Sequence, residues 1–168
     1  GGAGMSTAHK VWKFGADIDT DQLAPGAYMK LGIAEIARHC LEGVRPEFAA
    51  HVRPGDVLVA GPNFGIGSSR EQAAGALVEL GLKAVIAPSF SGLYFRNAFN
   101  LGLLLITCPQ AGVLQEGEAV GLDFERRQLL RASGEALTFE AIPDFLLDMV
   151  AAGGLLQQLK QQRKTRIS

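Results

Sequence analysis

The stretch that decides the fold is Gly61-Pro62-Asn63-Phe64-Gly65-Ile66-Gly67-Ser68-Ser69-Arg70-Glu71-Gln72-Ala73. Glycines such as Gly65 and Gly67 allow positive φ angles and let the backbone approach a ligand closely. Ser68 and Ser69 stand where a helix is expected to begin, and the N-terminus of a helix offers N–H groups and the positive end of the helix dipole to an anion. Arg70 adds a planar guanidinium whose shape matches a carboxylate. We therefore interpret the stretch as a carboxylate-binding turn between a strand and a helix.

The commoner glycine motifs do not match this stretch. A P-loop needs a lysine after its last glycine, but here that glycine is followed directly by Ser68. The dinucleotide fingerprint GxGxxG fails because Arg70 stands at the third glycine position, and the nucleophile elbow GxSxG fails because no glycine follows either serine at that spacing. A plain strand-to-helix turn remains open, because two residue pairs fit a capping box: Ser68–Glu71 and Ser69–Gln72. Two serines and an arginine are nevertheless more than capping requires.

The bulk composition is that of one globular domain. The chain has 168 residues, an apolar fraction of 48% and a net charge of −1, which favours neither nucleic acid nor a membrane surface as a partner. No apolar run approaches the roughly 20 residues of a membrane span and no signal peptide is visible, so we expect a cytoplasmic protein. Residues 1–4, before Met5, are typical of a cloning remnant, and we expect a single domain over residues 5–168. Cys40 and Cys108 lack the spacing of a CxxC or iron–sulfur site, so we expect two buried, reduced thiols and no metal on this chain.

Hydrophobic periodicity predicts a parallel α/β core followed by a β-rich part. In the first part, strands are predicted over residues 11–14, 56–60, 84–87 and 103–107. Helices are predicted between them over residues 33–41, 46–51, 69–80 and 91–100. This alternation is the signature of a parallel sheet. The remainder predicts short antiparallel strands over residues 119–124, 128–132 and 136–139, then helices over residues 143–150 and 155–163.

The polar loop predicted over residues 15–26 is rich in aspartate. Asp17, Asp19 and Asp21 alternate as in a calcium loop, but the glycine and the glutamate that an EF-hand needs at its sixth and twelfth positions are replaced by Gln and Tyr. Local turns built on aspartate side chains are one interpretation. The other is that one carboxylate supports Ser68 or Arg70.

Tyr28 and Lys30 follow in a second loop, which therefore carries one aromatic and one basic residue. Such a loop can bind the far end of a substrate; a partly packed surface loop is an equally open interpretation. His39 and His51 lie on predicted helices without a Cys or His at metal-ligand spacing, so we interpret both as structural or surface residues.

Together these motifs resemble a known family. Asp19-Thr20-Asp21, then Tyr28, then the pattern Gly-x-Asn-Phe-Gly-x-Gly-Ser-Ser-Arg-Glu-Gln-Ala of residues 61–73 resemble the small subunit of 3-isopropylmalate dehydratase. This subunit is the swivelling domain of the aconitase superfamily, shared with homoaconitase. The resemblance runs from about residue 11 to residue 159. It includes the segments Arg45-Pro46-Glu47-Phe48, Val52-Arg53-Pro54-Gly55-Asp56, Phe95-Arg96-Asn97 and Asn100-Leu101-Gly102-Leu103.

The resemblance implies an aconitase-type swivelling β/β/α fold and half of a hydro-lyase. In the family a separate large subunit carries a [4Fe-4S] cluster, so the resemblance implies that partner and no cofactor on this chain. It implies reversible dehydration and rehydration of a hydroxy di- or tricarboxylate, here the interconversion of 2-isopropylmalate and 3-isopropylmalate in leucine biosynthesis. By the family's motif, Ser68 is the base, and Ser69 and Arg70 hold the substrate carboxylate beside Gly65 and Gly67.

The same resemblance makes Asp21 an electrostatic support and places Tyr28 and Lys30 among the substrate-binding residues. Two positions depart from the family pattern. Relatives commonly carry Ala-Arg where this chain has Ser91-Gly92. At Lys30, isopropylmalate enzymes tend to carry an apolar residue and homoaconitases an arginine. The alternatives are therefore the small subunit of a homoaconitase, citramalate or dimethylmalate hydro-lyase and, in a different class, a non-catalytic carboxylate-binding or assembly module.

Overall fold

A mixed seven-stranded sheet runs through the protein, whose computed structural model describes residues 8–167. The segment interpreted as a cloning remnant, residues 1–4, lies outside the described residues. In the order in which they lie side by side, the strands are β4 (Leu105–Thr107), β3 (Ala84–Ala87), β2 (Val57–Val59), β1 (His9–Lys13), β5 (Ala119–Asp123), β6 (Gln128–Arg131) and β7 (Ala136–Thr138).

The sheet has a parallel half and an antiparallel half, as the sequence predicts. Strands β1 to β4 are parallel, and β1 pairs with β5 in the antiparallel sense. Strands β5, β6 and β7 then continue as an antiparallel meander. A 3₁₀ turn, η3 (Ala111–Val113), lies between the two halves along the chain.

The sheet curls until its two edges approach each other. Just after β7, the Glu140 N–H donates to the carbonyl of Thr107 on β4 at 2.9 Å. The Cys108 thiol lies 3.6 Å from the carbonyl of Thr138. These contacts cover backbone groups that two open edges would otherwise expose.

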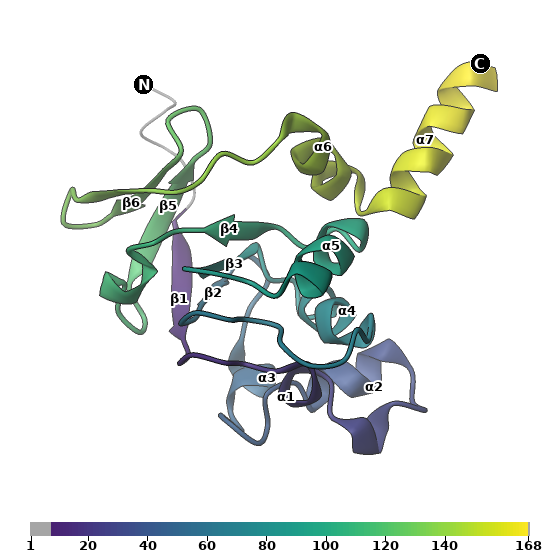
Figure 1. Ribbon diagram of the computed structural model, residues 1–168, viewed down its shortest axis with the longest axis horizontal. Helices are drawn as coiled ribbons and strands as arrows, with labels where there is room; N and C mark the ends of the chain where they lie inside the picture. Colours follow the sequence, from purple (N-terminus) through teal and green to yellow (C-terminus); the bar gives the residue numbers. More distant parts are fainter. Residues whose placement is uncertain (1–7, 168) are drawn as a thin grey trace.

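Helices α4 (Gln72–Glu79) and α5 (Gly92–Asn100) connect the parallel strands. The chain crosses from β1 to β4 in one direction, and right-handed crossovers then place the connecting helices on one face of the sheet. Figure 1 shows α4 and α5 on the same side of these strands, with α2 (Ile33–Arg38) packed beside α4. The β1–β2 connection also contains short helical turns: α1 (Thr20–Leu23), η2 (Gly26–Tyr28) and α3 (Phe48–His51).

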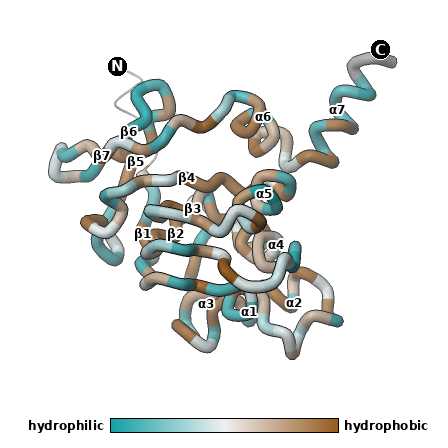
Figure 2. The backbone as a smooth tube through the Cα atoms, viewed as in Figure 1, coloured by the Kyte–Doolittle hydropathy of each residue, from teal (hydrophilic) through white to brown (hydrophobic). Residues whose placement is uncertain are grey.

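Two helices end the chain, α6 (Asp144–Ala152) and α7 (Leu155–Ile167), and each extends past its predicted end. Gly153 and Gly154 separate them with φ angles of 91° and 113°, a conformation that ends a helix and favours glycine. Figure 1 shows α7 projecting from the body of the protein, and Figure 2 shows it becoming hydrophilic towards its end. Among residues 8–167, no helix combines the length and apolar character needed to cross a bilayer.

The prediction of an irregular polar loop over residues 15–26 is wrong at α1. Asp19 caps this helix: its Oδ1 accepts from the Gln22 N–H at 2.7 Å, and the Gln22 side chain accepts from the Asp19 N–H at 2.9 Å. This reciprocal pair is a capping box. The helix begins here because these two hydrogen bonds satisfy the N–H groups of Asp19 and Gln22, which have no partner inside the helix.

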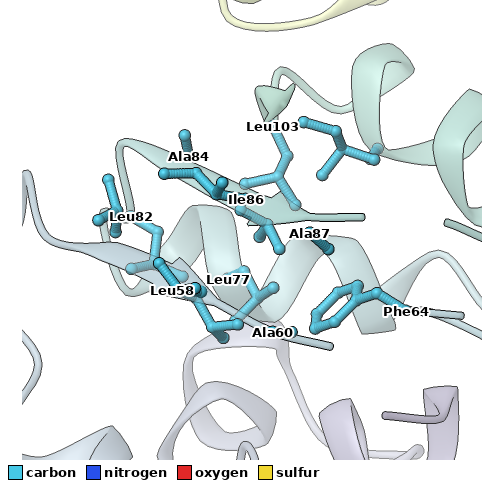
Figure 3. Close-up of a cluster of buried hydrophobic side chains, with 14 of the residues drawn as sticks. Leu58, Ala60, Phe64, Leu77, Leu82, Ala84, Ile86, Ala87 and Leu103 are labelled. Carbon is cyan, nitrogen blue, oxygen red and sulfur yellow. The ribbon is translucent and has the colours of Figure 1, made fainter. Parts of the chain in front are cut away.

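The core lies between the parallel strands and α4. Figure 3 shows Leu58 of β2 and Ile86 of β3 beside Leu77 of α4, and all three side chains are fully buried. Phe64 lies at one end of this cluster, and its ring meets that of Tyr94 edge-on with 5.4 Å between centroids. The core therefore holds the start of the glycine–serine–arginine turn.

Candidate functional site

The turn over residues 65–70 lies at the carboxyl ends of the parallel strands. Beyond the strands, Phe64 pairs with Phe90, which follows β3, and Ile66 pairs with Asp19, which follows β1. Ligands of α/β sheets bind outside the carboxyl ends of the strands. The predicted carboxylate-binding turn is therefore placed where a ligand is expected.

Two glycines of this turn adopt conformations that other residues rarely adopt. Gly65 has a φ of 86°, and a Cβ atom there would lie 2.2 Å from Cγ of Tyr94. Gly67 has a φ of 105°, and a Cβ atom there would lie 2.9 Å from Oγ1 of Thr20. The turn therefore needs both glycines, because its backbone presses against α1 on one side and α5 on the other.

The turn borders a narrow hollow, which is too small to hold a water molecule. Its lining residues are Thr20, Gly65, Gly67, Ser68, Ser69, Arg70, Leu93, Tyr94 and Asn97. Ser68 and Ser69 are both exposed to solvent. Sequence reasoning missed Thr20 and the three residues of α5 as part of the site. The position of α5 directly after β3, at the same edge of the sheet, is the signal that could have found them.

The two serines do not cap α4, so the predicted capping boxes are wrong. The helix begins at Gln72 rather than Ser69, and no side chain within residues 8–167 caps it. The Arg70 N–H donates to the Ser68 carbonyl at 2.9 Å, which makes a separate tight turn ahead of the helix. The serine hydroxyls are therefore presented at the hollow instead of serving the helix.

Arg70 is held by hydrogen bonds to the first part of the β1–β2 connection, which includes α1. Its Nη1 donates to the Ala24 carbonyl at 2.9 Å and lies 3.2 Å from Oδ1 of Asp21. The same Oδ1 accepts from the Gly26 N–H at 2.9 Å. Asp21 is 70% exposed, and exposed ion pairs contribute only about 0–1 kcal/mol, so this contact chiefly orients the guanidinium. No acceptor within residues 8–167 engages Nε or Nη2 of Arg70, and these donors face no competitor for a ligand.

The other two aspartates of the loop are used differently. Asp19 caps α1, so the interpretation as aspartate-based local structure holds for this residue. Asp17 adopts a φ of 58°, and its Oδ1 accepts from the side chain of the distant Asn63 at 3.0 Å. Asp21 contacts the site arginine. Among the described residues, no group of three or more His, Cys, Asp or Glu side chains is placed to hold a metal ion.

Tyr28 and Lys30 do not line the hollow. The Tyr28 hydroxyl donates to Oε2 of Glu42 at 3.0 Å, and its ring stacks on His39 with 3.6 Å between centroids. Lys30 is exposed on the following turn. Direct contact of either side chain with a substrate stays a prediction.

Both cysteines are free and buried, as the sequence predicts. Burial raises the pKa of the Cys40 thiol and of the Cys108 thiol, so both stay protonated near neutral pH. A [4Fe-4S] cluster is ligated by a group of Cys thiolates, whereas no group of three or more Cys, His, Asp or Glu side chains is gathered among the described residues. The two cysteines of this chain therefore do not fit a [4Fe-4S] cluster.

A larger cleft of about 740 Å³ lies towards the amino ends of β1 and β2. It is lined by two arginines, Arg45 and Arg53. Arg45 donates to both carboxylate oxygens of Glu116 at 2.8 and 2.9 Å and to Glu47 at 2.9 Å. These carboxylates raise the pKa of the Arg45 guanidinium and already occupy its donors. We place the candidate functional site at residues 65–70 instead, because Ser68, Ser69 and Arg70 lie together there at the carboxyl ends of the parallel strands.

Known proteins are similar to this chain at the turn over residues 65–70 and over most of the remaining sequence. The family described as the aconitase C-terminal domain matches residues 44–111. The 3-isopropylmalate dehydratase small subunit 1 of Archaeoglobus fulgidus is 41% identical over 157 residues, which are 92% of this chain and 98% of that protein. The chain belongs to the 3-isopropylmalate dehydratase small-subunit family.

This family includes proteins named for two different reactions. The methanogen homoaconitase small subunit of Methanothermobacter thermautotrophicus is 40% identical over 161 residues, covering 95% of this chain and 94% of that protein. A crystal structure of 3-isopropylmalate dehydratase from Methanocaldococcus jannaschii superposes with a TM-score of 0.88 at 37% identity, covering 95% and 96% of the two chains. The predicted aconitase-type fold and the predicted family are confirmed.

Proposed function

We propose that this chain is the small subunit of a hydro-lyase that interconverts 2-isopropylmalate and 3-isopropylmalate in leucine biosynthesis. The observation that carries the proposal is the turn of two exposed serines, Ser68 and Ser69, beside the half-buried Arg70. Arg70 is anchored through Nη1, and its other donors have no partner among the described residues. The near full-length similarity to named small subunits of this enzyme supports it.

The proposed roles follow from the chemistry of each group. Nε and Nη2 of Arg70 bind a substrate carboxylate as a planar fork, and Ser69 adds a second donor beside it. Gly65 and Gly67 let this carboxylate approach the backbone of the turn. Asp21 does not need to touch the substrate, because its contact with Nη1 fixes the plane of the guanidinium.

Ser68 is proposed as the base that takes the proton from the carbon next to this carboxylate. A serine hydroxyl is a poor base in water, and its alkoxide needs preorganised positive charge and exclusion of solvent. Arg70 supplies the charge in this chain. Ser68 itself is exposed, so the exclusion of solvent has to come from a partner that covers the turn.

The proposed partner is the large subunit with its [4Fe-4S] cluster, since the two cysteines of this chain do not fit one. When bound there, the cluster supplies a Lewis acid for the substrate hydroxyl. The substrate is a hydroxy dicarboxylate with an apolar branch. Lys30 and the similarity to a homoaconitase subunit keep one alternative open, in which the lysine binds the extra carboxylate of a tricarboxylate.

The test is Ser68→Ala in the assembled two-subunit enzyme, with Ser133→Ala in the β6–β7 turn as the matched control. Loss of a general base lowers turnover by about 10²–10⁴-fold. Because Ser68 is exposed and caps nothing within the described residues, the free energy of unfolding should change by less than about 0.5 kcal/mol. Near-normal turnover of the Ser68 variant would exclude this residue as the base. Substrate binding by the wild-type complex without turnover would favour the non-catalytic carboxylate-binding module.

A further inference from the structure

Tyr28 is held by two side chains from the end of α2 and the turn that follows it. Its hydroxyl donates to Oε2 of Glu42 at 3.0 Å, and its ring is nearly parallel to that of His39, with 10° between the planes. His39 and Glu42 are themselves joined, since Nδ1 of His39 lies 2.7 Å from Oε1 of Glu42. The three side chains, which we call the Tyr28 clamp, therefore close a ring of contacts.

The donors and the acceptor in the Tyr28 clamp can be assigned from the chemistry of its side chains. An ionised carboxylate only accepts hydrogen bonds, so Glu42 accepts from the Tyr28 hydroxyl and from a proton on Nδ1 of His39. The hydrogen bonds from His39 and Tyr28 lower the pKa of the Glu42 carboxyl. The bond to Glu42 also raises the pKa of the Tyr28 hydroxyl, which keeps that donor protonated.

The clamp holds the middle of a segment whose first residues are tied to the site. Residues 25–32 begin beside Asp21, whose carboxylate accepts from the Gly26 N–H and also contacts Arg70. They then pass through Tyr28 and turn back, with the Leu31 N–H donating to the Tyr28 carbonyl at 2.9 Å. Figure 1 shows this segment beside α1 and α2.

Just after Tyr28, the segment exposes Lys30 and Leu31, the latter at 47%. One is cationic and the other apolar, and they are neighbours in the sequence. A rotation of the segment about Tyr28 therefore changes the directions in which the charge and the hydrocarbon point. The side chains that fix the rotation also fix these directions.

We propose that His39 and Glu42 are positioning residues that hold segment 25–32 through Tyr28 and thereby set which substrate tail the site accepts. The expected effect on substrate choice rests on the proposed function. The hold of the clamp on segment 25–32 can be tested without measuring turnover. Neither residue needs to touch the substrate, and their effect passes through Tyr28.

The first measurement is hydrogen exchange of the amides of residues 26–32 in the full chain. Glu42→Ala removes both hydrogen bonds, and we expect exchange there to rise about three- to ten-fold, the order of effect of one side-chain hydrogen bond on a local opening equilibrium. Glu42→Gln keeps an acceptor for Tyr28 and should restore part of the protection. Glu35→Ala is the matched control, because Glu35 is a carboxylate on α2, just before the clamp, and pairs only with the exposed Arg38 among the described residues.

The second measurement is kcat/KM of the assembled enzyme for 2-isopropylmalate and for a tricarboxylate with the same hydroxy-acid head. In Glu42→Ala we expect the ratio of the two values to change by at least about three-fold, mainly through KM, since the groups at residues 65–70 are unchanged. Glu35→Ala should leave the ratio as in the wild type.

Unchanged exchange at residues 26–32 in Glu42→Ala would overturn the clamp. An equal loss of kcat on both acids, with the ratio unchanged, would reduce His39 and Glu42 to a structural role and overturn the inference about selectivity. A wild-type enzyme that turns over neither acid would instead refute the proposed function, while the exchange data would still decide whether the clamp holds the segment.

Discussion

Replacement of Gly65 by alanine is the most direct test of the architecture of the site. Gly65 has a φ of 86°, and an alanine Cβ would lie 2.2 Å from Cγ and 2.5 Å from Cβ of Tyr94. Tyr94 is 3% exposed and its hydroxyl donates to the Ala73 carbonyl at 3.0 Å, so it cannot move away freely. Either the turn or the start of α5 has to shift.

The expected cost has two parts. A left-handed backbone costs an L-residue about 1–2 kcal/mol, and overpacking in a well-packed region costs about 1–3 kcal/mol. Together they lower the free energy of unfolding by about 2–5 kcal/mol. At about 2–4 °C per kcal/mol for a chain of this size, the melting temperature should fall by about 4–20 °C.

Two further glycines separate these two contributions. Gly134 has a φ of 95°, and a Cβ atom there would meet no neighbour within 4 Å, so Gly134→Ala should show the backbone cost alone, about 1–2 kcal/mol. Gly43 has open space and no positive φ, so Gly43→Ala should stay within about 0.5 kcal/mol of the wild type. Urea unfolding of the full chain measures all three. A Gly65 variant no less stable than the Gly134 variant would refute the argument that Tyr94 constrains the turn.

Three further predictions concern charge. Arg70→Lys should impair turnover and weaken substrate binding in the assembled enzyme, because lysine keeps the charge but cannot contact Asp21 and a carboxylate with separate planar donors; unchanged kinetics would mean that Arg70 does not face the substrate. Lys30→Val should leave isopropylmalate turnover intact or improve it if the ammonium lies in water, and should weaken tricarboxylate turnover if the ammonium binds the third carboxylate; steady-state kinetics on both acids distinguish the two cases. The pKa of Glu116 lies below its ordinary value of 4.5, chiefly because the Arg45 side chain donates to its carboxylate. The stabilisation from this pair is therefore present above pH 4.5 and is lost as pH falls through the lower folded-state pKa. Arg45→Met should flatten the decrease of melting temperature in this acid range, and an unchanged slope would contradict that origin.

The parallel core was predictable because its signals are local. Strands β2 and β3 are short apolar runs, each followed by a turn and a helical pattern, and β4 is a third apolar run. Each appears in the structure at nearly the predicted place. The helix α1 was missed although Asp19 and Gln22 carry a capping-box pattern, since three alternating aspartates suggested a loop. The start of α4 was predicted too early, because Ser68 and Ser69 match a capping pattern but do not cap the helix.

The contacts that support the site could not be predicted in the same way. Arg70 and Asp21 are 49 positions apart, and only the packing of the β1–β2 connection against α4 brings them together. Sequence reasoning could state that one of three aspartates supports the site, but not which one. His39, interpreted as a structural or surface residue, is partly exposed and stacks on Tyr28. Nothing in the spacing of these two residues indicates that partnership.

The structure also relates the exposure of the site to its proposed chemistry. The elements that require rigidity are buried: Phe64 and Tyr94 fix the turn, and both glycines are held against neighbouring backbone or side chains. Ser68, by contrast, is exposed to solvent, and Nε and Nη2 of the half-buried Arg70 have no partner among the described residues. A charge-stabilised alkoxide is strongly disfavoured in that aqueous setting, because water screens the guanidinium and competes for the same hydrogen bonds. Under the proposed function, preorganisation therefore comes from this chain and desolvation from the large subunit, so that the proposed base gains its basicity only in the assembled enzyme.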